Sequence, residues 1–97
     1  MAKYWLTFRI HEDANYSKRY NGLIGTLNKY GTAFWDGPTS FVAMDSAYSI
    51  DAISSAVKLG LISKDLFVIR EIGKDNTRYI GIPGTGFLHF FPKAKKV

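Results

Sequence analysis

The chain has no cysteine among its 97 residues. This excludes a disulfide framework, a thiolate metal site and a cysteine nucleophile. The chain also lacks any run near the roughly 18 apolar residues that a membrane-spanning helix needs. Residues 1–10 have no continuous apolar core, so we expect no signal peptide and no membrane partner. Together these absences predict a soluble protein of the cytoplasm.

An excess of one charge sign is present but small. Lysine and arginine number 13 against eight acidic residues, which gives a net charge of +5 and favours polyanionic partners. Lys93, Lys95 and Lys96 account for much of that excess. We therefore expect a single, mildly basic domain at residues 1–92, followed by a basic, disordered tail at residues 93–97.

Two periodicities alternate along the chain. Alternating apolar residues predict strands at residues 3–10, 32–35, 39–45, 65–72 and 78–82. Apolar residues three and four positions apart predict helices at residues 16–30 and 49–59. Asp13 or Asn15 is expected to cap the first helix and Ser49 the second, while Gly31 is expected to end the first in a left-handed conformation. We interpret Gly22 and Gly25, inside the first helix, as a site of close packing on the sheet.

The order of these segments is typical of one α+β fold. It predicts a ferredoxin-like βαββαβ sandwich, with a four-stranded antiparallel sheet, two helices on one face and an extra C-terminal strand. The other face of the sheet is expected to be bare, and a second copy of the chain is its simplest cover. The sequence thus predicts a homodimer. Its expected interface residues are Trp5, Tyr79, Ile80, Ile82 and Phe87.

Short dispersed motifs add a family resemblance over about residues 3–82. The motifs are Phe8-Arg9-Ile10, Lys29-Tyr30-Gly31, Thr39-Ser40-Phe41, Asp65-Leu66-Phe67-Val68-Ile69 and Ile80-Gly81-Ile82. Their layout resembles the small CRISPR-associated adaptation subunit and its VapD-like relatives of the ferredoxin-fold superfamily, and also the short bacterial proteins called SinR-like. The resemblance implies a homodimer in which the last strand of each chain joins the partner's sheet. It also implies a metal-dependent nuclease in some relatives, with an aspartate near the position where this chain has Arg9.

One compact group of side chains has acid–base or metal-binding chemistry. His11, Glu12 and Asp13 are adjacent, and His11 and Asp13 are the candidate catalytic residues. Three neighbours at the end of a strand cannot all point at one ion, so a solvated loop is the favoured interpretation. We accordingly expect no metal and no cofactor, except a divalent metal ion if the chain is a nuclease.

The function that these observations favour is binding rather than catalysis. We expect a non-catalytic homodimeric module that contacts either a nucleic-acid backbone or a protein of a defence or toxin system. The candidate nucleic-acid contacts are Arg9, Lys18, Arg19 and Lys29. Two alternatives stay open: a metal-dependent nuclease, acting on RNA or DNA, with a degenerate carboxylate site, and an inhibitor that caps a larger complex.

Overall fold

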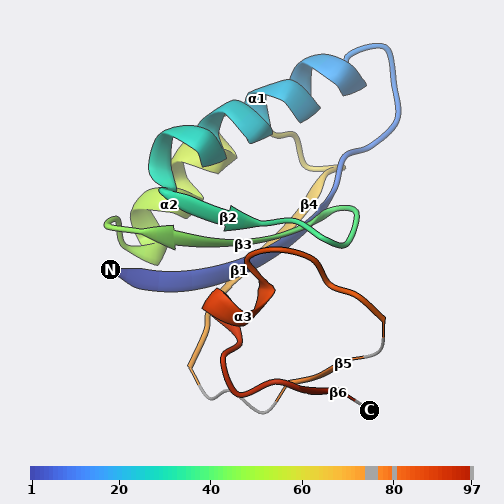
Figure 1. Ribbon diagram of the computed structural model, residues 1–97. Helices are drawn as coiled ribbons and strands as arrows, with labels where there is room; N and C mark the ends of the chain where they lie inside the picture. Colours follow the sequence, from blue (N-terminus) through green and yellow to red (C-terminus); the bar gives the residue numbers. More distant parts are fainter. Residues whose placement is uncertain (74–76, 80, 97) are drawn as a thin grey trace.

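The computed structural model describes residues 1–73, 77–79 and 81–96 and is drawn in Figure 1. Its main sheet contains β1 (Ala2–Arg9), β2 (Ala33–Trp35), β3 (Phe41–Ser46) and β4 (Leu66–Glu71). These strands are antiparallel and lie in the spatial order β2-β3-β1-β4. Helices α1 (Tyr16–Tyr30) and α2 (Ile50–Lys58) follow β1 and β3. The predicted α+β class, with a four-stranded antiparallel sheet and two main helices, is confirmed.

The main core lies between the sheet and the two helices, which cover the same face (Figure 1). The alternation predicted for β1 holds, because Tyr4, Leu6 and Phe8 all point into this core and are buried. Across the sheet and helices the other buried members are Ile10, Leu23, Leu27, Val42, Met44, Ile53 and Val57. The residues that pack on the first face of the sheet are therefore those whose spacing in the sequence predicted the strands and helices.

The second face carries a smaller core. The segment that contains β5 (Arg78–Tyr79), α3 (Phe87–Phe90) and β6 (Lys95–Lys96) lies on the side opposite α1 and α2 (Figure 1). Its Phe87 and Phe90 are buried against Trp35 of β2 and Ala43 of β3. The prediction of a wholly bare face is thus wrong, because the chain's own C-terminal segment covers the part over β2 and β3.

The end of the chain differs from the predicted extra strand. Among the described residues, β5 consists of Arg78 and Tyr79, which pair in parallel with β6 instead of joining the main sheet. Ile82 lies outside any strand and is 95% exposed, while Ile80 lies outside the described residues. Lys95 and Lys96 of the predicted tail lie along β5, and the Lys95 N–H donates to the Thr77 carbonyl at 3.1 Å.

The helix ends follow the predictions in part. The Ser49 hydroxyl caps α2 by accepting the Ala52 N–H at 3.1 Å. Gly31, however, is extended and not left-handed, with φ −101° and ψ 156°. A Cβ at Gly31 would lie 2.7 Å from the Phe34 ring. Any side chain at this position would have to displace the Phe34 ring, so Gly31 allows a close approach and does not form a left-handed turn.

The interpretation of Gly22 and Gly25 as a close contact is wrong. Both glycines lie on the exposed side of α1, and a Cβ built at either position meets no atom within 4 Å. They therefore lower the helical propensity of α1 without a packing reason.

We predict that Gly22→Ala and Gly25→Ala each raise the free energy of unfolding by about 1 kcal/mol, because alanine loses less backbone entropy in a helix. Urea denaturation followed by circular dichroism measures the change.

Gly37→Ala is the matched comparison. Its Cβ would lie 2.7 Å from the Trp35 ring and 3.1 Å from the Pro83 carbonyl oxygen. We expect this variant to lose about 1–3 kcal/mol through overpacking. Equal effects of alanine at Gly25 and at Gly37 would contradict this account of the glycines.

Candidate functional site

Arg19 of α1 is the centre of a group of ion pairs. Its Nε lies 3.0 Å from Asp65 Oδ2 and its Nη1 lies 3.1 Å from Asp13 Oδ1. Its Nη2 donates to the His11 carbonyl at 2.9 Å. The arginine side chain is only 10% exposed. This guanidinium, a predicted nucleic-acid contact, is directed at carboxylates of its own chain.

Asp65 is the buried member of this group. Its side chain is shielded from solvent and accepts the N–H groups of His11 at 2.8 Å and Ile62 at 3.0 Å. Burial by itself would raise the pKa of Asp65, but these two N–H groups and Arg19 outweigh it, and the pKa is lowered below its ordinary value of 3.8. The pKa of Asp13 is also lowered, first by the hydrogen bond from Arg19 and then by the Asn15 N–H.

These contacts decide what the predicted acid–base residues can do. Both carboxylate oxygens of Asp13 accept hydrogen bonds from Arg19, and His11 contacts Asp65 and Arg19 through its backbone. Asn15 begins α1 without a side-chain cap. In the described part of the chain, no three His, Cys, Asp or Glu side chains are grouped to hold a metal ion. The arrangement fastens the start of α1 to the loop before β4.

We predict that Asp65→Asn lowers the free energy of unfolding by about 3 kcal/mol at neutral pH, because it breaks a buried ion pair. The native pKa of Asp65 lies below its ordinary value of 3.8. The stabilisation from its charge is therefore complete above about pH 5 and is lost as the pH falls through the native pKa. Urea titrations from about pH 7 to pH 2 should show that the free energy of unfolding falls less with decreasing pH in the variant than in the unmodified protein.

The control for this prediction is Asp36→Asn at an exposed position. We expect it to change the free energy of unfolding by less than about 0.5 kcal/mol. If the free energy of unfolding of the Asp65 variant fell with decreasing pH as steeply as that of the unmodified protein, the role given to this carboxylate would be refuted.

The other predicted nucleic-acid contacts do not share one surface. Lys18 and Lys29 are exposed in the first and last turns of α1, about 16 Å apart along the axis. Lys29 Nζ lies 5.9 Å from the centre of the Tyr30 ring. Arg9 ends β1 on the opposite face of the sheet from these helix residues.

A strip of the second face stays uncovered beside the C-terminal segment. We call it the open strip and define it by Trp5, Thr7 and Arg9 of β1 together with Leu66, Val68 and Arg70 of β4. The register sets Trp5 opposite Arg70, Thr7 opposite Val68 and Arg9 opposite Leu66. Leu66 and Val68 are 50% and 43% exposed. The bare face predicted from the sequence is thus limited to β1 and β4.

A cleft of about 390 Å³ separates the open strip from the C-terminal segment. Trp5 and Arg70 line one side, and Thr77 and Phe91 line the other. The Trp5 ring is stacked on Phe41 with centres 6.0 Å apart and planes at 18°. The cleft therefore places an aromatic face beside a guanidinium. Alternation along residues 65–72 already sets Arg70 on the face of Leu66, but only the strand pairing brings it opposite Trp5.

His89 fixes the C-terminal segment near this cleft. Its Nε2 lies 2.7 Å from Asp45 Oδ2, and its carbonyl accepts a hydrogen bond from Lys3 Nζ at 2.8 Å. Asp45 Oδ1 is buried and has no hydrogen-bond partner among the described residues. These contacts join α3 to β1 and β3, so the histidine has a structural position between the two layers.

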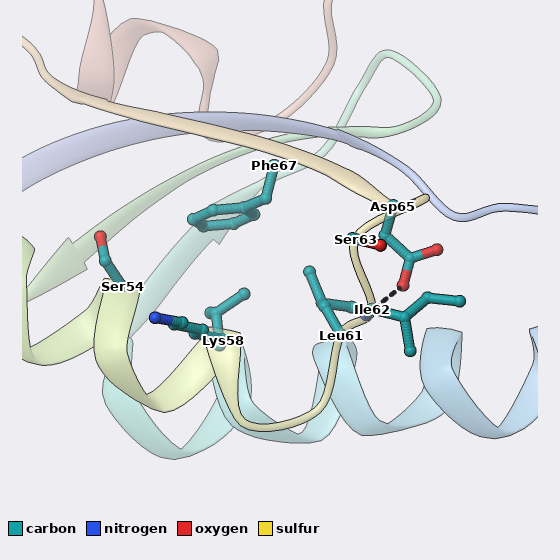
Figure 2. A pocket seen from close by; sticks show the side chains of 8 residues that line it. Ser54, Lys58, Leu61, Ile62, Ser63, Asp65 and Phe67 are labelled. Carbon is teal, nitrogen blue, oxygen red and sulfur yellow. Dashed lines mark hydrogen bonds between the residues drawn. The ribbon is translucent and has the colours of Figure 1, made fainter.

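A second pocket, of about 380 Å³, lies on the helix side of β4 (Figure 2). Phe67 projects into it from β4, and Leu61 and Ile62 line it from the loop after α2. Lys58 and Ser54 of α2 provide its polar side. The pocket is mainly apolar and adjoins the outer strand of the sheet.

Comparison with known proteins gives no assignment. No protein-family model and no curated protein matches the chain. Every helix among the described residues is too short or too polar to cross a membrane. The resemblance drawn from short motifs therefore stays a prediction.

Proposed function

We propose that the protein is a non-catalytic binding module of the ferredoxin-like type whose open strip contacts a nucleic-acid backbone. The observation that carries the proposal is the pairing of β1 with β4, which sets Arg9 and Arg70 on one uncovered face around Trp5. Guanidinium groups bind phosphate oxygens, and an exposed aromatic face can stack on a base.

The element order supports the ferredoxin-like part of the proposal. Each main helix connects two strands that have another strand between them in the sheet, β3 between β1 and β2 and β1 between β3 and β4. This strand order is the one expected of the split βαβ arrangement, in which both helices pack on one face. The other face is then left for the C-terminal segment and for a ligand.

The distribution of acidic residues favours an anionic partner. Asp13 and Asp65 are paired with Arg19, and Asp45 is paired with His89. Glu71 lines the cleft next to Arg70, but the strand register sets it opposite Tyr4, whose side chain points to the helix side. There it adds to burial in raising the pKa of Tyr4. The two charged residues that define the open strip, Arg9 and Arg70, are both positive.

Further cations continue this surface beyond the cleft. Arg78 is the register partner of Lys95, and Lys96 follows on β6, with all three side chains exposed. Thr77, which precedes Arg78, lines the cleft across from Arg70. A phosphate backbone that lies along the open strip can thus reach the cations of the β5–β6 pair.

We predict that Arg9→Ala and Arg70→Ala each weaken binding of single-stranded DNA or RNA and that the double variant weakens it further. Each substitution should reduce the slope of log affinity against log salt concentration by about 1, because one phosphate contact is lost. Fluorescence anisotropy of labelled oligonucleotides of both kinds, at several salt concentrations, measures these quantities.

The matched control is the double variant Lys18→Ala with Lys29→Ala, which removes the same charge from α1 on the other side of the sheet. Its affinity should fall much less than that of the double arginine variant. Absence of any binding to DNA and RNA at low salt would refute the proposal. An equal loss in the two double variants would move the contact surface to α1 and would also refute it.

A further inference from the structure

The two edges of the main sheet differ in their protection. Edge strand β2 has three residues and is followed directly by Asp36, Gly37 and Pro38. Edge strand β4 has six residues, with neither glycine nor proline, and it pairs with β1 in an unbroken register. Short strands, prolines and bulges are the usual means of blocking an edge. Strand β2 is short and is followed by a proline, whereas β4 has only the charged Arg70 and Glu71 near its end.

The outer side of β4 presents free backbone groups. The Ile72 N–H donates to the Lys3 carbonyl at 2.8 Å, so Ile72 and every second residue before it face β1. The N–H and C=O groups of Phe67, Ile69 and Glu71 consequently point away from β1. In the described part of the chain, no strand lies beyond β4.

Apolar side chains flank this edge on both faces of the sheet. Leu66 and Val68 are exposed on the open strip. Phe67 and Ile69 are half-buried on the helix side, where Phe67 lines the apolar pocket of Figure 2. A strand added to β4 would therefore bury apolar surface on both of its faces while it satisfied the backbone groups.

We propose that this strand is β4 of a second copy, paired antiparallel about a two-fold axis at Ile69. In this register Phe67 of each copy faces Glu71 of the other, and Ile69 faces Ile69. It is the register in which all three outward-facing residues of β4 meet an outward-facing residue of the second copy. Because a two-fold axis makes the contact self-complementary, pairing closes at two copies and removes both unprotected edges.

The charges agree with this register. Glu71 of the second copy comes opposite Phe67, on the helix side, where Lys58 lines the adjoining pocket. Arg70 comes opposite Val68 of the second copy. A shift by one hydrogen-bonded step toward the end of β4 would set Arg70 directly against Arg70, and like charges in that position are destabilising.

This inference specifies the dimer contact at the strand edge and does not depend on nucleic-acid binding. A two-fold axis at this edge, normal to the sheet, puts α1 and α2 of both copies on one side and both open strips on the other. The proposed dimer is thus one eight-stranded sheet, in contrast to two sheets stacked face to face.

We expect the unmodified protein, measured without nucleic acid, to have twice the 10.9 kDa mass of the chain by light scattering and sedimentation equilibrium. Val68→Lys should raise the dissociation constant of the dimer about tenfold or more, because two introduced lysines each face an Arg70 of the other copy. Val68 is 43% exposed, and circular dichroism checks that the variant is folded.

The register is tested by rescue. Val68→Lys combined with Arg70→Glu sets opposite charges across the axis twice and should restore the dimer. Leu88→Lys is the matched control, since Leu88 is 57% exposed on α3, outside the proposed contact, and the dimer should persist. A single-chain mass at high concentration, a dimer that survives Val68→Lys, or a double variant that stays monomeric would each overturn the inference. Failure of the anisotropy experiment would leave these masses unchanged, so the two proposals fail separately.

Discussion

The contact on which the second layer depends is the packing of Trp35. Its Nε1–H donates to the Pro83 carbonyl at 2.7 Å, and its ring meets Phe87 edge-on with centres 4.9 Å apart. This sheet carries apolar side chains on both faces, and its two helices cover only one of them. Trp35 gives the C-terminal segment a fixed anchor on the other face. The anchored segment covers β2 and β3. It leaves the open strip on β1 and β4 uncovered.

Local patterns in the sequence were sufficient where one element determines its own burial. Alternation in residues 3–10 identified the buried side of β1, and the Ser49 cap was found from residue type and position because capping is a local interaction. The same local reasoning failed for Gly31, whose role is set by Phe34 and Met44. It also failed for the C-terminal aromatic residues, because nothing near Phe87 in the sequence shows that Trp35 will receive it.

The candidate site was less predictable for the same reason. Arg19 was counted among the exposed cations of α1, yet its buried partner Asp65 is 46 positions away in the sequence. Net charge calculated from the sequence treats every arginine alike. In the fold, however, Arg19 forms structural ion pairs, whereas Arg9 and Arg70 stay uncovered. Arg70 gained its significance only from the order of the strands, which sets β4 beside β1. The sequence therefore shows which residues are arginines, but it does not show which of them are accessible to a ligand.

The covered face and the open edge are connected by this strand order. Because β1 lies inside the sheet and β4 at its border, any surface left uncovered on β1 continues directly to an unprotected edge. A partner strand at that edge extends the open strip sideways and does not cover it, because the added residues lie beside β4 and not over it. Under the proposed two-fold pairing, the arginines of two copies line one continuous face. A long polyanion fits such a surface better than a compact ligand does, because its charges repeat along its length as those of the joined strips do.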